Sequence, residues 1–312
     1  MEIGFIGLGK MGGNMVRRLS QGGHQCHIYS IDAAERAALA TETGAVPAGS
    51  LAALVKAMAA PRTLWLMVPA GKITQGVIDA LGTLLGPGDC IIDGGNSNFK
   101  DSVARAAALA PHGIAMLDCG TSGGLFGLER GYSLMIGGED AAVARNAPIF
   151  ACLAPGVALA ERTPARAAGP LAPGEDGWLH CGPAGAGHYV KMVHNGIEYG
   201  IMQAFAEGFA LFKSVGTEAV PVERRYQLDL AAIAEVWRRG SVVASWLLDL
   251  GADALAEDPE LASYSPRVAD SGEGRWTLEA AIEQGTAAPV IADALFAQIG
   301  RASCRERVYS SV

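Results

Sequence analysis

In the first half of the chain, short apolar runs alternate regularly with longer helical stretches rich in alanine and leucine. The apolar runs have the length of strands and lie at 3–7, 25–30, 63–68, 90–93, 114–118 and 132–137. They are almost continuously apolar, which is typical of parallel strands covered on both faces. The alternation therefore predicts an α/β domain with a doubly wound parallel sheet of the Rossmann type.

The second half of the chain has a different character. Residues 155–187 are dense in proline and glycine, and they predict a last short strand followed by a linker. Beyond them only helical patterns occur, at 188–215, 222–236, 240–256 and 276–299. We therefore predict an α/β domain over 1–177, followed by an all-α C-terminal domain over 178–299.

The end of the chain differs from everything before it. The run "IGRASCRERVY" carries four charged residues and a cysteine, with no apolar period. It resembles the translated read-through of a common sequencing adapter. We therefore expect residues 300–312 to be a non-native tail and the native end of the gene to be missing. Resequencing the locus tests this, because an unbroken native codon run through Val312 would contradict it.

Composition excludes several classes of protein. Half of the residues are hydrophobic and 18% are charged, as in a compact globular protein. The net charge of −8 argues against a nucleic-acid binder and against a polybasic membrane surface. The start "MEIGFIGLG" enters a strand without a basic leader, and six cysteines form no C-x-x-C pair. We therefore expect a cytoplasmic protein with reduced thiols and with no membrane or nucleic-acid partner.

The stretch "GFIGLGKMGGNMVRRL" follows the first strand and opens a helix. Gly7, Gly9 and Gly12 have the G-x-G-x-x-G spacing of a dinucleotide-binding turn. The first glycine permits the tight turn, the second admits a pyrophosphate, and the third lets the helix pack on the strand. Unpaired N–H groups at the helix start then hold the anion. The predicted cofactor contacts of this turn are Gly7, Leu8, Gly9, Lys10, Met11 and Gly12.

The choice of dinucleotide depends on the end of the second strand. Asp32 lies 20 residues after Gly12, near the position of an acid that holds the ribose 2′-OH of NAD. An equally good interpretation makes Asp32 the N-cap of the next helix. Ser30 ends the strand, and Arg36 is the nearest cation for the 2′-phosphate of NADP. We expect NAD, with NADP as the alternative, and count Ser30 and Asp32 as cofactor contacts.

Two loops follow successive strands of the predicted sheet. "IIDGGNSNFKDS" places Asn96 after one strand, and "DCGTSGGLFGLERG" places Ser122, Gly123 and Gly124 after the next. Ligands of open α/β sheets bind beyond the carboxyl ends of the strands. A plain loop remains the alternative for each. Together with Thr121, the second loop offers hydroxyl and backbone N–H groups to an anion.

The stretch "HYVKMVHNGIEYGIMQAFAEGF" is predicted to be helical. At 3.6 residues per turn, Lys191, Asn195 and Glu198 share one face, and His194 flanks it. The opposite side, which we assign to the core, carries Val190, Val193, Ile197 and Ile201. The polar face is either a surface salt bridge or a catalytic site, because a partly buried lysine has a lowered pKa and can act as a base. His188 and His194 do not share a face, which argues against a metal site.

Together these motifs resemble the 6-phosphogluconate dehydrogenase family (decarboxylating), in its short single-repeat form within the β-hydroxyacid dehydrogenase superfamily. The resemblance covers nearly all of 1–299. Its motifs are "GFIGLGKMGGNM", "MVPAG", "DGGNSNFKDS", "GTSGGLFGLERGYSLMIGG", "GPAGAGHYVKMVHNGIEYGIMQAFAEGF", "WRRGSVVASWLLDL" and "DSGEGRWTLEAAIEQG". The glycine turn alone would fit the whole superfamily, whereas the segment around Lys191 is specific to this family.

The resemblance implies oxidative decarboxylation of 6-phosphogluconate to ribulose 5-phosphate in the pentose phosphate pathway. Lys191 would act as the base and Glu198 as the acid that protonates C1. The residues that would contact the substrate are Asn96, Ser122, Gly123, Gly124, His194, Asn195 and, at the phosphate, Tyr199. The loop with Val68, Pro69, Ala70 and Lys72, and Asn96 again, would line the cofactor. The helical domain would then bind the substrate and form a homodimer or homotetramer, as its apolar run "SVVASWLLDLGADALA" also indicates.

The chain departs from the family at two positions. Ser271 replaces a lysine that longer members carry before their "G-T-G-K-W" run, and Ala244 stands near the place of an arginine in their second repeat. Family members also close the site with a partner's C-terminal tail. Two alternatives therefore stay open. Beside 6-phosphogluconate oxidation, the alternatives are a β-hydroxyacid dehydrogenase acting on a small unphosphorylated acid and a cofactor-binding protein inactivated by C-terminal truncation.

Overall fold

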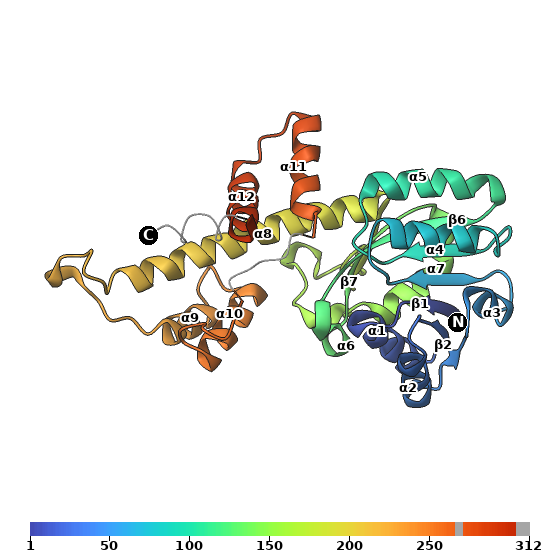
Figure 1. Cartoon of the computed structure of the whole chain (residues 1–312), viewed down its shortest axis with the longest axis horizontal. Helices are drawn as coiled ribbons and strands as arrows, with labels where there is room; N and C mark the ends of the chain where they lie inside the picture. Colours follow the sequence, from blue (N-terminus) through green and yellow to red (C-terminus); the bar gives the residue numbers. More distant parts are fainter. Residues whose placement is uncertain (266–270, 304–312) are drawn as a thin grey trace. The chain divides into compact units, whose positions relative to one another are not determined.

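The computed structural model describes residues 1–265 and 271–303, and side chains up to residue 299. The chain divides into two compact units, Met1–Met192 and Val193–Val312 (Figure 1). Unit 1 contains one eight-stranded sheet with the strand order β3-β2-β1-β4-β5-β6-β7-β8. The strands are β1 (Glu2–Ile6), β2 (Gln25–Tyr29), β3 (Val46–Pro47), β4 (Thr63–Leu66), β5 (Cys90–Asp93), β6 (Ala115–Ser122), β7 (Ser133–Gly137) and β8 (Trp178–Gly182).

Helices cover both faces of this sheet, as the alternation predicted. They are α1 (Lys10–Gln21), α2 (Ala33–Thr43), α3 (Leu51–Lys56), α4 (Lys72–Gly82), α5 (Phe99–Leu109), α6 (Gly127–Arg130) and α7 (Asp140–Leu153). One buried cluster joins α1, α2 and α7 to the sheet around Phe5 and Trp65. A second cluster on the other face joins α3, α4 and α5 around Leu64 and Leu66. The Rossmann-type α/β architecture is thus confirmed.

The sheet is not parallel throughout. β6 and β7 pair antiparallel, with Cys119 opposite Ile136, while every other neighbouring pair is parallel. A short connection through α6 joins these two strands, and such a connection reverses the chain instead of crossing over the sheet. The strand expected within 155–187 is β8, which pairs with β7 and belongs to unit 1. Unit 1 therefore extends past residue 177 to Met192.

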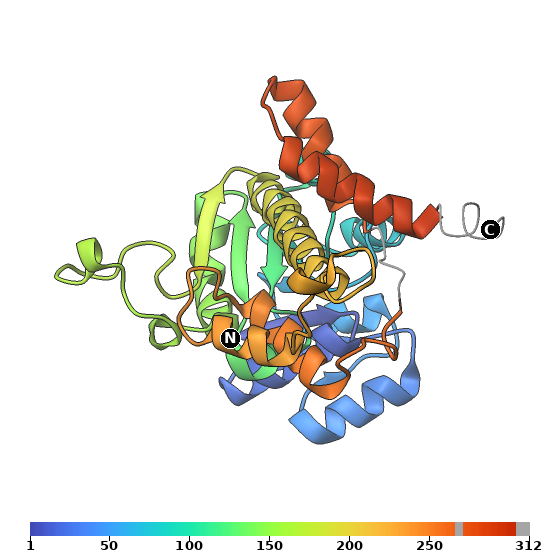
Figure 2. The same ribbon diagram turned by 90° about the vertical axis from the view of Figure 1, so that its left-hand side faces the viewer.

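A long loop joins α7 to β8 and extends away from the sheet (Figure 2). The guanidinium of Arg162 holds it together, because it pairs with the Glu175 carboxylate at 2.9 Å and donates to the carbonyls of Ala167, Gly169 and Pro170. This pairing lowers the pKa of Glu175 to about 2, through the hydrogen bond from Arg162 first and that from the Ala172 N–H second. The proline- and glycine-rich segment is an ordered loop.

Within the described part of the chain, one helical stretch, Asp140–Leu159, has the length and apolar composition of a membrane span. It contains α7, which lies in the core of unit 1. Ile149 and Phe150 are fully buried there, and Asn146 accepts a hydrogen bond from Thr63 of β4 at 2.8 Å. The apolar composition of α7 is explained by its packing on the sheet.

α8 (Ala186–Ser214) begins in unit 1 and continues into unit 2. Unit 2 is helical in its described residues, which confirms the expected all-α second half. Its further helices are α9 (Leu230–Arg238), α10 (Trp246–Glu257), α11 (Glu273–Gln284) and α12 (Pro289–Ser303). Phe205 and Phe209 of α8 pack on the α9–α10 pair around Ala234 and Leu248, and Tyr199 packs with Leu295 of α12.

The helical pattern at 276–299 was wrongly predicted as one helix. α11 ends at Gln284 because Gly285 adopts a left-handed conformation with φ of 64°, and its N–H caps the carbonyls of the last turn. α12 then starts at Pro289, where a missing N–H costs nothing. The pattern at 222–236 also starts later, because α9 begins at Leu230 behind the N-cap Asp229. Within the predicted tail, 304–312 lies outside the described residues.

Candidate active site

The glycine turn after β1 has the geometry of a dinucleotide site. Gly7 has φ of 92°, and a Cβ there would lie 2.3 Å from the carbonyl oxygen of Met67. A Cβ on Gly12 would lie 2.1 Å from the carbonyl oxygen of Gly7, so α1 packs directly on the turn. Gly9, the N-cap of α1, faces open space instead. The turn thus presents the N–H groups at the start of α1, next to Leu8, to an approaching anion.

The end of β2 is built around two side chains. Asp32 is the N-cap of α2, and its Oδ1 accepts hydrogen bonds from the N–H groups of Ala34 and Glu35 at 2.8 and 3.2 Å. Ser30 is buried and donates to the Glu35 carboxylate at 2.6 Å. The Arg36 guanidinium turns back to donate to the Ser30 carbonyl. The capping interpretation of Asp32 is therefore correct, and its exposed carboxylate still lies at the strand end where a ribose would bind.

The loop between β4 and α4 carries the other predicted cofactor contacts. Pro69, Ala70 and Lys72 are exposed, and Val68 is half-buried. The Thr74 hydroxyl donates to the Pro69 carbonyl at 2.9 Å and fixes the loop.

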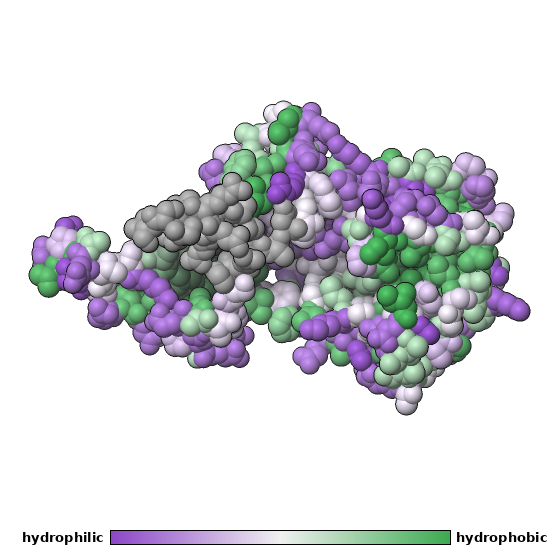
Figure 3. All heavy atoms as spheres, viewed as in Figure 1, coloured by the Kyte–Doolittle hydropathy of each residue, from purple (hydrophilic) through white to green (hydrophobic). Residues whose placement is uncertain are grey.

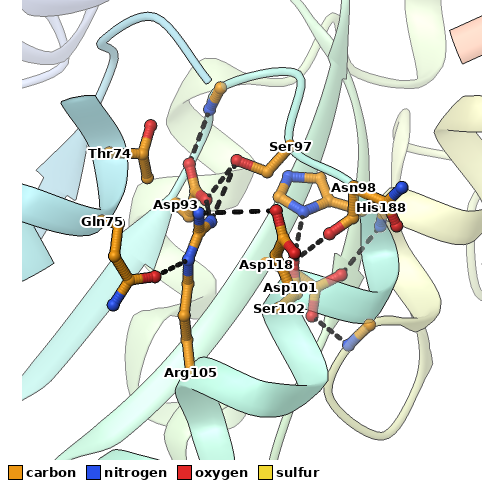
Figure 4. A network of polar contacts seen from close by, with 12 residues as sticks. Thr74, Gln75, Asp93, Ser97, Asn98, Asp101, Ser102, Arg105, Asp118 and His188 are labelled. Atoms are coloured by element: carbon orange, nitrogen blue, oxygen red, sulfur yellow. Dashed lines mark hydrogen bonds and ion pairs between the residues drawn. The ribbon is translucent and has the colours of Figure 1, made fainter. Parts of the chain in front are cut away.

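The loop after β5 is held by a buried ion pair. Asp93 accepts hydrogen bonds from the Gly95 N–H at 3.1 Å and from the Ser97 hydroxyl at 2.7 Å. Its carboxylate also pairs with Arg105 of α5 at 3.0 Å, and both side chains are buried (Figure 4). Asn96, between the two bonded residues, is the exposed member of this loop. The network therefore leaves the Asn96 amide available to a ligand.

The loop after β6 continues the same edge of the sheet. Ser122 ends the strand, and Gly123 and Gly124 have φ of 146° and 53°, which suits glycine alone. A Cβ on Gly124 would meet nothing within 4 Å, so its backbone is open to a ligand. The sequence predicted that Thr121 offers its hydroxyl to an anion. In the structure Thr121 is buried, and its hydroxyl donates to the Cys119 carbonyl instead.

α8 carries the remaining predicted residues. Lys191 is 7% exposed and Asn195 is 8% exposed, although both are strongly polar. His194 Nδ1 lies 3.1 Å from the Asn195 Oδ1 and 3.8 Å from the Glu198 carboxylate. The hydroxyl of Tyr199, which is itself buried, lies 3.3 Å from that of Ser271. This hydrogen bond joins the predicted phosphate contact to Ser271, one of the two departures from the family that the sequence resembles.

One expectation for α8 was wrong. Val190, Ile197 and Ile201 are 40, 52 and 39% exposed, although they were assigned to the core. On the polar face Lys191 and Asn195 are buried, whereas the side chains of His194 and Glu198 are 39 and 35% exposed. This burial means that Lys191 and Asn195 are not members of a surface salt bridge, because such pairs are solvated. Ala244, the second departure, lies exposed in the turn before α10.

Sequence reasoning missed the buried polar residues beneath the loops: Ser102, Arg105, Asp118 and His188. A signal existed for Asp118, because an acid inside the apolar run "IAMLDC" needs a partner when that run is a buried strand.

Two other kinds of reactive group are the metal-ligating side chains and the thiols. Within 1–265 and 271–303 no group of three or more His, Cys, Asp or Glu side chains is arranged to hold a metal ion. Burial raises the pKa of the Cys26 thiol to about 11 and that of the Cys90 thiol to about 12. These thiols are protonated at neutral pH and are not nucleophiles.

The glycine turn, the loops at the carboxyl ends of β4 to β6 and a helix with a buried lysine define a class of protein: a nucleotide-dependent dehydrogenase with a helical second half. Family models identify the member. Residues 2–160 match the NAD binding domain of 6-phosphogluconate dehydrogenase, and residues 187–311 match the C-terminal domain of the same enzyme. The chain belongs to the 6-phosphogluconate dehydrogenase family.

Individual relatives agree. The chain is 40% identical over 301 residues to an NAD(+)-dependent, decarboxylating 6-phosphogluconate dehydrogenase of Haloferax volcanii, covering 96% of this chain and 90% of that protein. The structure of Plasmodium falciparum 6-phosphogluconate dehydrogenase matches with a TM-score of 0.79 at 26% identity, over 96% of this chain and 62% of that one. A 3-hydroxyisobutyrate dehydrogenase from Salmonella typhimurium shares the fold, with a TM-score of 0.70 at 21% identity over 97% and 95% of the two chains.

Proposed function

We propose that this chain catalyses the oxidative decarboxylation of 6-phospho-D-gluconate to ribulose 5-phosphate and CO₂, with reduction of NAD⁺ or NADP⁺. The observation that carries the proposal is the burial of Lys191, at 7% exposure, on a helix that also bears Asn195 and Glu198. An amine withdrawn from water favours its neutral form and can accept a proton near neutral pH. The Haloferax relative, which this chain nearly spans, bears the name of this activity.

The glycine turn fits the pyrophosphate of the cofactor, because Gly9 leaves open space in front of the first N–H groups of α1. Asp32, at the end of β2, is the acid that would accept a bond from the ribose hydroxyls. Arg36 is engaged with the Ser30 carbonyl and lies 5.8 Å from the centre of the Tyr29 ring, which supports NAD as the preferred cofactor. Val68, Pro69, Ala70 and Lys72 are proposed to line the cofactor, with Asn96 beside them.

The chemistry divides between two groups of α8. Lys191 accepts the proton of the 3-hydroxyl, and the nicotinamide of a cofactor held at the glycine turn would supply the acceptor for the hydride from C3. The β-keto acid so formed loses CO₂, and the Lys191 ammonium returns its proton to the carbonyl oxygen to give the enediol. Glu198 then protonates C1 while the neutral Lys191 takes up the proton of the enediol hydroxyl, which leaves the ketone of ribulose 5-phosphate. This series of reaction steps needs a base with a pKa near the working pH and a separate acid that protonates carbon.

The other predicted contacts are proposed to orient the sugar acid. Asn96, Ser122, Gly123 and Gly124 offer an amide, a hydroxyl and open backbone to its carboxylate and hydroxyls. His194 and Asn195 extend the same role along α8. The Tyr199 hydroxyl, paired with Ser271, is proposed to bind the phosphate.

Substitution of Lys191 by methionine tests the proposal. We expect Lys191→Met to lower kcat by at least about 10²-fold, because a positioned base contributes roughly 10²–10⁴-fold. NAD affinity, measured by fluorescence titration, should stay within about twofold, since the cofactor turn lies on β1 and α1. A variant that keeps a tenth of the wild-type kcat would remove Lys191 as the base.

The second candidate is a related dehydrogenase that acts on a small unphosphorylated acid. The fold shared with 3-hydroxyisobutyrate dehydrogenase is compatible with this candidate. Initial rates of NADH and NADPH formation with 6-phosphogluconate and with 3-hydroxyisobutyrate separate the two. Turnover of the small acid alone would overturn our proposal. We further propose that the enzyme is cytoplasmic and homo-oligomeric, in keeping with the free thiols of Cys26, Cys90, Cys119, Cys152 and Cys181.

A further inference from the structure

Asp118 is a buried carboxylate placed at the start of the helix that carries the proposed base. It lies on β6 and is 1% exposed. One of its oxygens accepts a hydrogen bond from the Gly185 N–H at 2.6 Å, and the other accepts one from the His188 N–H at 2.7 Å. The Gly185 N–H lies directly before α8 and the His188 N–H lies in its first turn, where the helix dipole favours a negative charge. Carboxylate bonds of this kind are about twice as strong as neutral ones.

The first turn of α8 also touches the backbone of the sheet. A Cβ on Gly187 would lie 2.3 Å from the Met135 carbonyl oxygen, and a Cβ on Gly137 would lie 2.5 Å from an oxygen of Asp118. A Cβ on Gly120 would lie 2.3 Å from the Cβ of Lys191. The stem of Lys191 therefore rests on the bare backbone of β6, two residues beyond Asp118.

A second tie reaches the same turn from α5. The Ser102 hydroxyl lies 2.7 Å from His188 Nδ1, and both residues are buried. Ser102 and Arg105 stand on adjacent turns of α5, and Arg105 supports the loop that presents Asn96 through its pairing with Asp93. Figure 4 shows this network extending from the β5 loop to the start of α8.

We propose that Asp118 is a positioning residue for Lys191, with the Ser102–His188 bond as its second support. The carboxylate fixes the first turn of α8 against β6 and so sets where the Lys191 amine lies relative to the strand ends. This inference rests on the proposed function, because it takes Lys191 as the base. A displacement of about 1 Å at a reacting group can cost about 10²-fold in rate, so a support of this kind affects turnover.

The test compares Asp118→Asn with a matched variant, Asp89→Asn. Asp89 is also 1% exposed and also accepts two backbone N–H bonds, from Arg62 and Gly86, besides an ion pair with the Arg62 guanidinium at 3.0 Å, but it lies just before β5. Parallel strands begin at the edge opposite the proposed site, so this variant loses a comparable buried carboxylate without touching α8. Both variants are assayed at a temperature where circular dichroism shows them folded. Ser102→Ala is the third variant. It removes one contact with His188, so we expect a smaller loss of kcat than in Asp118→Asn.

Three quantities are measured. We expect Asp118→Asn to lower kcat at least about tenfold and to raise the deuterium isotope effect on kcat with 3-deuterated 6-phosphogluconate, because hydride transfer becomes more rate-limiting. Asp89→Asn should leave both within about twofold of wild type. A merely lower fraction of folded enzyme would reduce kcat without changing the isotope effect. Ser102→Ala should change both in the same direction as Asp118→Asn.

The third quantity does not depend on turnover. Labelling of Lys191 by pyridoxal 5′-phosphate and borohydride, followed by peptide mass spectrometry, should be severalfold faster in Asp118→Asn and Ser102→Ala than in Asp89→Asn. Equal labelling in all variants would overturn the positioning role, as would an unchanged kcat and isotope effect in Asp118→Asn. An inactive wild type whose labelling still differs between the variants would refute the proposed function alone.

Discussion

Burial distinguishes two of the predicted site residues of α8, Lys191 and Asn195, from ordinary surface residues. Lys191 and Asn195 are almost fully buried, while Ile197 on the same helix is half exposed. Burying an amine costs free energy unless the protein compensates it, and such sites are found where chemistry requires a shifted proton affinity. Helical periodicity predicted which residues share a face. It did not predict which face is buried, because that depends on what packs against the helix.

Asp32 has an observed structural role and a proposed role in cofactor binding. Its Oδ1 caps α2, and serine caps helices about as well as aspartate. We therefore expect Asp32→Ser to change the free energy of unfolding by less than about 0.5 kcal/mol. The affinity of the Asp32→Ser enzyme for NAD should fall about tenfold, which corresponds to the loss of one charged hydrogen bond of roughly 1.4 kcal/mol. Urea unfolding and fluorescence titration measure the two effects.

The control is Asp32→Ala, which should lose both the cap, at about 1 kcal/mol, and the affinity. For Asp32→Ser the preference should also move toward NADP, because the carboxylate no longer repels a 2′-phosphate. An Asp32→Ser enzyme that binds NAD as tightly as wild type would leave Asp32 with the capping role alone.

Among the elements, the strands were the easiest to predict. Leu64, Ile91 and Leu117 belong to runs whose side chains are apolar on both faces of the sheet. β3 is two residues long and lacks such a run, so no periodicity reveals it. α11 and α12 were fused in the prediction because their apolar spacing continues across the break. Gly285 and Pro289 carried the information, but glycine also occurs inside helices of this chain, as Gly196 and Gly200 do in α8.

Arg18 connects α1, the helix that follows the glycine turn, to α6 and α7. Its guanidinium donates to the carbonyls of Cys152, Leu153 and Ala154 at the end of α7, and to that of Leu128 in α6. Charged donors at a helix C-terminus complement its dipole. We expect Arg18→Met to lower the free energy of unfolding by roughly 2–4 kcal/mol, because it leaves several carbonyls without their donor. Guanidinium unfolding measures this loss.

The neighbouring Arg17 is the matched control. It pairs with the half-exposed Glu42 at 2.7 Å on the surface. Solvated ion pairs contribute little, so Arg17→Met should cost no more than about 1 kcal/mol. If the two variants lost equal stability, the contacts of Arg18 with α6 and α7 would not be the reason for its effect.

For the whole molecule, the sequence predicted the fold class and the residues that line the strand ends, because both follow from local pattern and from the order of elements. It could not predict the support beneath the site. Asp118 and the first turn of α8 are far apart in sequence, and their contact exists only after the sheet forms. Ser102 and His188 meet for the same reason. Long-range polar contacts leave no periodic signal.

Hydrophobic residues reach the surface of unit 2 (Figure 3). Leu211, Val236, Val290 and Phe296 are 69, 69, 69 and 63% exposed, and Ile197 adds to them on α8. Exposed apolar residues in such numbers are typical of an interface between subunits. We therefore expect light scattering to give the mass of a homodimer or a larger homo-oligomer at micromolar concentration.

A charge on this surface should weaken the assembly. We expect Ile197→Asp to shift the mass toward the monomer, because a carboxylate buried in an apolar interface loses its hydration without gaining a partner. Leu171→Asp is the control: Leu171 is 57% exposed but lies in the loop between α7 and β8 of unit 1, so its mass should stay that of the wild type. A wild-type chain that is monomeric at micromolar concentration would contradict the prediction, and a dimer indifferent to both substitutions would place the interface away from the exposed face of α8.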